Sequence, residues 1–319
     1  MKGMVPVSWF DQPCIRGMLS VDAVHSLHWR AYGQKYLQPV LFLHGGPGSG
    51  VDLSSLCFFD PGTHYVVMFD QRGAGESIPA GSTCNNTTQH LIADIESLRS
   101  LMEISRWIVF GGSWGATLGL LYGQYYPASC IGLVLRGVSN SHIYQNHWML
   151  EQRPKLMPDR HRAFVKQLSE EQRSNPVKAH YHNILSEDVD RKLHALNAIN
   201  VLESGMSDAE PELLESCVEL TVDDLESDIF NRARIYLHYW VNKKFIDESQ
   251  CLPNPSALRD IPVLFVHGES DWICPLSGAK EIVGALPGTA LIIVPGGGHS
   301  PFHPDMTKAL QESLAEFVY

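Results

Sequence analysis

A serine between two glycines stands where a predicted strand turns into a predicted helix. The apolar run 107–110 stops at Gly111, and a helix-like apolar pattern starts at Ala116, with Ser113 and Gly115 between them. Because glycines lack Cβ atoms, strand and helix can crowd together, and the serine can take a strained backbone that exposes its hydroxyl. Small residues also cluster in ordinary turns, so the flanking elements carry this interpretation. The stretch predicts a nucleophile elbow with Ser113 as the nucleophile.

A serine hydroxyl becomes a good nucleophile only when a base takes its proton and a third group orients that base. In folds with such an elbow, the acid and the histidine follow the serine in that order, each on a loop at the carboxyl end of a strand. The apolar run 262–267 ends shortly before Asp271, and the run 290–294 ends shortly before His299. We expect Asp271 and His299 to complete a catalytic triad. The alternatives are a turn-forming aspartate and a core histidine.

A second glycine-rich stretch follows the apolar run 40–43 and begins at His44. The oxyanion formed during acyl transfer needs N–H donors that are already in place. We expect two donors, the amide of Gly45 or Gly46 and the amide of Trp114, which follows the serine. Alone, such a Gly/Pro cluster is more typical of a tight turn. Together with the triad, it predicts acyl transfer to water through a covalent intermediate.

The elements that position these residues alternate between strands and helices. Period-two stretches within 15–32 predict an antiparallel hairpin at a sheet edge. Apolar residues recur with helical spacing from Thr88, the expected N-cap, to Met102. Further strand runs lie at 39–43, 65–69 and 131–135. This alternation indicates an α/β fold, with a mostly parallel sheet and helices on both faces.

The alternation stops between about 138 and 260, where the sequence becomes polar, charged and helix-periodic. We expect helices there over roughly 158–171, 176–185, 187–204, 209–219 and 226–246. The strand pattern resumes at Ile261. The sequence therefore predicts a catalytic domain over 1–137 and 261–319 and an inserted helical cap over 138–260. Such a cap would cover the site and select substrates.

Three other polar features have simpler interpretations. Asp70 and Arg72 precede a glycine-punctuated turn and are close enough to order it, so we expect structural support from them. The acidic stretch 207–228 contains no Lys or Arg, which favours a solvated face; the alternative is a field that attracts a cationic substrate. His180 and His182 are two apart and no H-E-x-x-H sequence occurs, so no metal site is predicted.

Composition and charge argue against several classes of protein. The chain has 319 residues, 44% hydrophobic and 18% charged, and a net charge of −11. These values favour a water-soluble globular protein and disfavour a nucleic-acid or anionic-membrane partner. No apolar run reaches membrane-spanning length, and no signal-peptide pattern is expected at the N-terminus. Seven scattered cysteines without C-x-x-C spacing indicate reduced thiols and a cytoplasmic location.

With these residues in view, the sequence resembles the proline iminopeptidases, or prolyl aminopeptidases, of the α/β-hydrolase superfamily. The resemblance runs from about residue 15 to the C-terminus. Segments that look like the family's signature, acid and histidine blocks are 44–48, 70–77, 111–118, 267–271 and 297–300. The resemblance implies an α/β-hydrolase fold and a serine aminopeptidase that removes an N-terminal residue, typically proline, with no metal or cofactor.

The resemblance also implies where the substrate binds. Family members hold the free amino end with cap carboxylates, of which one corresponds to Glu203, and the position of the second is Tyr236. A tyrosine, with a pKa of about 10, does not neutralise an ammonium near neutral pH. Arg136 and Trp240 complete the candidate substrate-binding residues. Three positions of the apolar pocket lack the family's usual aromatic residues: Ile199, Leu202 and Ser139.

Three functions fit these observations. The first is an aminopeptidase that releases proline or another small N-terminal residue from peptides, with Glu203 binding the α-amine. The second is an esterase or amidase for uncharged small acyl substrates, which loss of the second carboxylate favours. The third is a ligand-binding protein on a hydrolase scaffold, which the complete triad disfavours. The expected partner is a small peptide or a small acyl substrate.

Overall fold

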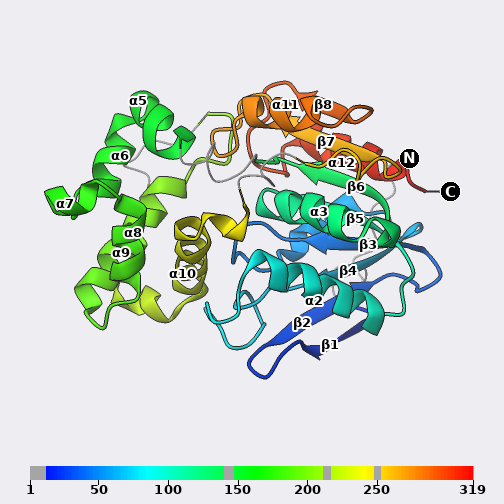
Figure 1. Cartoon of the computed structure of the whole chain (residues 1–319), viewed down its shortest axis with the longest axis horizontal. Helices are drawn as coiled ribbons and strands as arrows, with labels where there is room; N and C mark the ends of the chain where they lie inside the picture. Colours follow the sequence, from blue (N-terminus) through cyan, green and yellow to red (C-terminus); the bar gives the residue numbers. More distant parts are fainter. Residues whose placement is uncertain (1–11, 140–146, 211–216, 248–252, 319) are drawn as a thin grey trace.

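A mostly parallel sheet forms the centre of the computed structural model, which describes residues 12–139, 147–210, 217–247 and 253–318 (Figure 1). Its eight strands are β1 (Ile15–Ser20), β2 (Ser26–Tyr32), β3 (Gln38–Leu43), β4 (His64–Phe69), β5 (Trp107–Gly112), β6 (Cys130–Arg136), β7 (Val263–Gly268) and β8 (Ala290–Val294). Their order is β1-β2-β4-β3-β5-β6-β7-β8. β2 pairs antiparallel with both β1 and β4, and the remaining pairs are parallel. The predicted edge hairpin and α/β class are confirmed.

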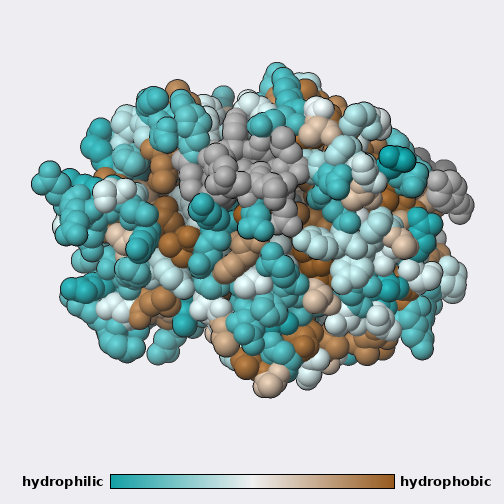
Figure 2. All heavy atoms as spheres, in the orientation of Figure 1, coloured by the Kyte–Doolittle hydropathy of each residue, from teal (hydrophilic) through white to brown (hydrophobic). Residues whose placement is uncertain are grey.

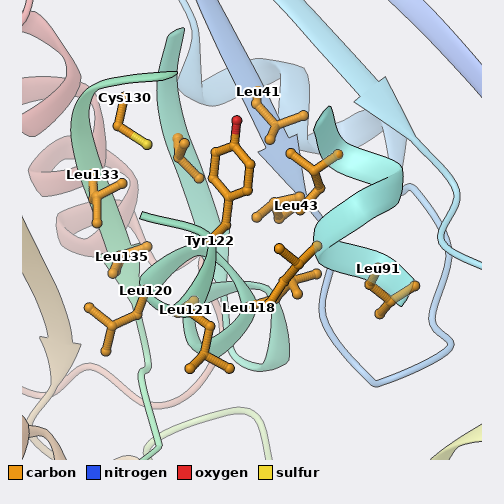
Figure 3. Close-up of a cluster of buried hydrophobic side chains, with 14 of the residues drawn as sticks. Leu41, Leu43, Leu91, Leu118, Leu120, Leu121, Tyr122, Cys130, Leu133 and Leu135 are labelled. Carbon is orange, nitrogen blue, oxygen red and sulfur yellow. The ribbon is translucent and has the colours of Figure 1, made fainter. Parts of the chain in front are cut away.

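Helices cover both faces of this sheet. The helices α2 (Thr88–Leu101), α3 (Trp114–Tyr125) and α11 (Leu276–Gly284) bury apolar side chains against one face, and α12 (Pro304–Ala315) covers the other with the short helix Leu53–Phe58. Figure 3 shows leucines of α3 and of β3 packed around Tyr122. Strands buried on both faces must be apolar throughout, which explains why they stand out as continuous apolar runs in the sequence.

Helices fill the described part of the chain between β6 and β7. They are a π-helical turn at His147–Gln152, α5 (Arg153–Leu156), α6 (Pro158–Val165), α7 (Glu170–Arg173), α8 (Pro176–Ile184), α9 (Val189–Glu203), a short helix at Val222–Glu226, α10 (Asp228–Val241) and a short helical turn at Lys243–Phe245. They form a lobe beside the sheet, at the left of Figure 1. This lobe has its own apolar cluster, which includes Phe164, Leu196 and Leu237. The exact division into a domain of 1–137 and 261–319 and a cap of 138–260 stays a prediction.

Several predicted helix limits are wrong. The N-cap of α2 is Thr87, whose hydroxyl accepts from the amide of His90, and not Thr88. The helix predicted over 158–171 breaks after Val165, because a second helix starts behind its own Ser169 capping box. The helix predicted over 209–219 is not seen at 209–210 or 217–219, and its centre lies outside the described residues.

The surface agrees with the composition. Figure 2 shows hydrophilic side chains over most of the visible face, with hydrophobic ones in small separate groups. Among the described residues, no helix combines the length and apolar character needed to cross a membrane.

Candidate active site

Ser113 occupies a sharp turn between β5 and α3, with φ 57° and ψ −121°. A side chain at Gly111 would collide with the backbone of Gly115, and one at Gly115 would collide with the backbone of Leu43. The backbone amide of Ser113 donates to the carbonyl of Arg136 at 2.8 Å, which ties the turn to the neighbouring strand. A left-handed φ is costly for serine, and such strain is typical of functional sites. The structure therefore has the elbow geometry expected from the sequence.

Asp271 and His299 form a hydrogen-bonded pair on the loops after β7 and β8. The Nδ1 of His299 lies 2.7 Å from the Oδ2 of Asp271. The other carboxylate oxygen accepts from the amides of Ile273 and Cys274, at 2.9 and 2.7 Å. Burial alone would raise the pKa of Asp271, but the imidazoles of His299 and His267 and these hydrogen bonds outweigh it and lower the pKa. A charged, fixed carboxylate at this place orients the imidazole.

Ser113 and His299 face the same cavity of about 400 Å³. Gly137 has a left-handed φ of 59° and packs against the ring, since a Cβ there would lie 3.2 Å from the Cε1 of His299. Gly45 also lies next to the serine: a Cβ there would be 3.4 Å from the Cβ of Ser113. The structure thus brings together the expected nucleophile, base, acid and glycine-rich loop, and Gly46 and Trp114 also line the cavity.

Gln71 holds the two predicted oxyanion segments together. Its side-chain amide donates to the carbonyl of His44 at 2.9 Å and accepts from the indole N–H of Trp114 at 2.9 Å. Its backbone amide donates to the Nε2 of His44, also at 2.9 Å. The sequence does not single out Gln71 as a functional residue, although it indicates a structural role for its neighbours Asp70 and Arg72. The one signal for this role of Gln71 is its position directly after β4, beside the loop that follows β3.

Asp70 and Arg72 have the structural role that the sequence predicts. Asp70 accepts from the amide of Val51 at 2.7 Å. Arg72 donates two hydrogen bonds to the carboxylate of Asp94, both at 2.7 Å, and a third to Asp22 at 2.6 Å. Both residues are buried and neither lines the cavity. They fix the loop that carries Gln71.

The lobe side of the cavity carries the predicted amine-binding residues. Glu203, at the end of α9, accepts from Arg232 of α10 at 2.9 Å. Tyr236 is buried beside it. Burial, and then the charge of Glu203 and a hydrogen bond to it, hold the pKa of Tyr236 well above its usual value, so the phenol stays neutral and donates to the carboxylate. The structure brings Glu203 and Tyr236 together, with an arginine that the sequence analysis did not include.

The other two predicted substrate-binding residues have different places. Arg136 lines the cavity, but its guanidinium is buried and donates to the carbonyl of His299 at 2.7 Å, so it positions the histidine loop. Trp240 lies in the apolar cluster of the lobe, with ring centroids 5.5 Å from Tyr236 and 6.4 Å from Phe164. It does not line the cavity, which corrects the expectation of direct substrate contact.

One group of described residues has side chains suited to a metal ion, His28, Asp70 and Glu76. The guanidinium of Arg30 already contacts all three, at 2.8, 3.3 and 2.7 Å. Because this arginine supplies the positive charge that the carboxylates need, the cluster is explained without a metal.

A strained serine after the central strand, with an acid and a histidine on later strand ends, is the arrangement of α/β-hydrolase serine enzymes. Residues 38–305 match the model of the alpha/beta hydrolase fold family. A probable proline iminopeptidase from Leptolyngbya boryana is 37% identical, covering 96% of this chain and 95% of its own. Proline iminopeptidase from Arabidopsis thaliana is 38% identical over 94% of this chain and 78% of its own.

Solved structures give the same fold. A structure titled as proline iminopeptidase from Mycobacterium smegmatis superposes with a TM-score of 0.57 at 17% identity, over 95% of this chain and 97% of its own. VinJ superposes with a TM-score of 0.60 at 20% identity, over 96% and 98%. The chain belongs to the proline iminopeptidase family of α/β hydrolases.

Proposed function

We propose that the protein is a serine aminopeptidase that releases proline, or another small N-terminal residue, from peptides. The observation that carries this proposal is that His299, paired with Asp271 at 2.7 Å, lines the same cavity as Ser113 and Glu203. The names of the relatives support the substrate. All six described cysteines are free, which fits the cytoplasmic location inferred from the sequence.

In the mechanism that we propose, His299 takes the proton of Ser113 as the serine oxygen attacks the substrate carbonyl. Backbone amides of Trp114 and of Gly45 or Gly46 donate to the oxyanion. Asp271 holds the tautomer of the imidazole and stabilises the imidazolium. His299 then gives the proton to the leaving amine and activates water, which hydrolyses the acyl-enzyme. Glu203 would bind the free α-amine, with the phenol of Tyr236 beside it.

One observation favours a second candidate, an esterase or amidase for uncharged small acyl substrates. Glu203 is already engaged by Arg232 at 2.9 Å, and Tyr236 brings no second negative charge. An ammonium must therefore compete with a guanidinium for one carboxylate, whereas a neutral acyl group would not.

Paired turnover separates the two candidates. The substrates are a prolyl arylamide, its N-acetylated form and a short-chain aryl ester, each with wild type and with Ser113→Ala. Hydrolysis confined to the free-amine arylamide supports the aminopeptidase, and indifference to acetylation or a preference for the ester supports the second candidate. Ser113→Ala should lose at least about 10⁴-fold in kcat while its circular dichroism stays unchanged, because the proposed acyl-enzyme forms on the Ser113 hydroxyl. Substantial residual turnover would remove Ser113 from its role.

A further inference from the structure

Lys244, in the turn after α10, is a buried lysine that faces the candidate active site. Its side chain lines the same cavity as Ser113 and His299, and the residue is only 6% exposed. Among the described residues, no carboxylate pairs with its Nζ. An unpaired buried charge is expensive and is normally removed or neutralised by a partner. Within the described part of the chain, the cavity therefore contains a cation without a counter-ion.

The backbone of the turn that carries Lys244 is strained. Lys243, Lys244 and Phe245 have φ values of 56°, 55° and 53°, three consecutive left-handed residues, none of them glycine. The hydroxyl of Thr88 donates to the carbonyl of Lys244, and Gln89 donates to the carbonyl of Phe245 at 2.8 Å. These bonds anchor the turn through its backbone. The ammonium itself has no part in them, and glycine would suit this φ better than lysine.

The contacts of the ammonium place it near residues that neighbour Ser113. Its Nζ lies 5.9 Å from the ring centroid of Trp114, the residue that follows Ser113. Burial lowers the pKa of Lys244 to about 8, and Cys274 is the residue whose charge would oppose this. Burial raises the pKa of the Cys274 thiol to about 12, however, so it stays neutral and supplies no charge. A hydrogen bond with Ser113 acts on the same thiol, so Lys244 and Ser113 are both neighbours of Cys274.

The charge of the whole cavity wall supports the same conclusion. The charged side chains that line it, counted over the described residues, are Arg136, Arg232, Lys244 and a single carboxylate, Glu203. Arg232 pairs with Glu203, and Arg136 donates to a backbone carbonyl. In a chain with a net charge of −11, this wall is positive, and Lys244 is the member without a polar partner among the described residues. Such a wall attracts an anionic group of a substrate.

We propose that Lys244 binds a carboxylate of the substrate next to the scissile bond. This rests on the proposed aminopeptidase function and narrows its substrate class to short peptides with a free C-terminus, dipeptides above all. In a dipeptide, a single Cα separates the scissile nitrogen from the α-carboxylate, which fits a cation that lines the same cavity as the nucleophile. Glu203 would then hold the amine end of a zwitterionic substrate and Lys244 the carboxylate end.

The carboxylate could belong to the leaving amino acid or to the acyl part, and two substrate pairs separate these sources. The first pair is prolyl-glycine and prolyl-glycinamide, and the second is p-nitrophenyl hemisuccinate and p-nitrophenyl butyrate. Each is measured as a ratio of kcat/KM within the pair. Prolyl p-nitroanilide, which has no carboxylate, reports on the aminopeptidase function separately. If wild type fails on the anilide and on both prolyl peptides, the proposed function falls, whatever the ester pair shows.

Four variants test the lysine. Lys244→Met removes the charge, Lys244→Gly removes both charge and strain, Lys244→Arg keeps the charge, and Lys243→Gly is the matched control, exposed on the same turn. We expect Lys244→Met and Lys244→Gly to reduce the prolyl-glycine to prolyl-glycinamide ratio by about tenfold to a hundredfold, the usual weight of a hydrogen bond to a charged group. The anilide rate of both variants should stay within about threefold of wild type. Lys244→Arg and Lys243→Gly should keep the wild-type ratio.

Three results would be decisive. A drop confined to the hemisuccinate to butyrate ratio supports the carboxylate site and moves its source to the acyl part. Unchanged ratios for both pairs in Lys244→Met and Lys244→Gly overturn the proposal, even where wild type cleaves the anilide well. Equal losses on the anilide and on both members of each pair overturn it too, because they would show general damage and not loss of a carboxylate contact.

Discussion

Two buried cations of this molecule, Arg72 and Lys244, differ in their partners. Arg72, on the loop after β4, is 3% exposed and binds the carboxylates of Asp94 and Asp22. Lys244, on the turn after α10, is 6% exposed and has no carboxylate partner among the described residues. Burial opposes the charge of both. The carboxylates hold the pKa of Arg72 above its usual value, whereas that of Lys244 falls to about 8.

This difference distinguishes a cation that stabilises the fold from a cation that is available to bind a ligand. A buried ion pair that is complete within the protein fixes a loop and leaves nothing for a ligand to satisfy. A buried cation with no partner lowers stability and leaves a free interaction for whatever enters the cavity. The loop after β4 carries a cation of the first kind, Arg72, and the turn after α10 carries one of the second kind, Lys244. In the function that we propose, chemistry and selection of substrate are therefore carried by different parts of the chain.

The largest effect should come from breaking the paired cation. Arg72→Met leaves Asp94, which is buried, without its bidentate partner, and removal of one member of a buried ion pair costs about 3–5 kcal/mol of unfolding free energy. Urea denaturation measures this loss. Lys35→Met, which breaks an exposed pair with Glu103, is the control and should change little. Loss of less stability in Arg72→Met than in the control would contradict a supporting role.

Removal of the unpaired cation, Lys244, should raise the free energy of unfolding, whereas removal of Arg72 should lower it. At about pH 7, Lys244 is protonated in the folded and the unfolded chain, so the folded chain bears the full cost of burying the charge. Lys244→Met should therefore be more stable than wild type, by about 3 kcal/mol if the pKa falls from 10.5 to about 8 on folding. As the pH rises from about 8 to about 10.5, folded wild type loses this proton before the unfolded chain does, and its stability rises relative to the variant.

Chemical denaturation of both proteins at about pH 7 and about pH 9.5 measures this effect. The advantage of Lys244→Met should shrink by about 2 kcal/mol over that interval, since one unit of pKa corresponds to about 1.4 kcal/mol. Subtracting the unfolding free energy of wild type from that of Lys244→Met cancels the titration of the tyrosines and cysteines, because both proteins contain them. A constant difference would mean that Lys244 keeps its usual pKa in the folded chain.

The sequence predicts the strand ends better than the cavity wall for a physical reason. Buried parallel strands must be apolar throughout, and the elbow and the two loops follow directly on such runs, so Ser113, Asp271 and His299 could be found one element at a time. Gln71 could not, because its role depends on two segments that meet only in the folded sheet.

Which residues line the cavity wall depends on where helices end and on how they pack. The periodicity of the sequence leaves helix ends uncertain by several residues. Trp240 has the aromatic character of a pocket residue, yet it faces the lobe core, and Arg232 is exposed and gives no signal in the sequence. Lys244 was included only as part of a predicted helix over 226–246. The left-handed turn that aims it into the cavity is visible only in the structure.

The smallest effect should come from Glu203, whose carboxylate is partly exposed and already accepts a hydrogen bond from Arg232. Glu203→Gln should lower kcat/KM for the free-amine prolyl arylamide by about tenfold, as expected when a charge-assisted hydrogen bond is lost, and should leave a neutral aryl ester unchanged. Arg232→Gln removes the competing guanidinium and should act in the reverse direction, lowering KM for the free amine. Steady-state kinetics of both variants on both substrates tests the pair together. If Glu203→Gln slows the ester as much as the arylamide, Glu203 supports the wall and does not bind the amine, and Lys244 would remain the only charged group of this wall to which we assign a substrate contact.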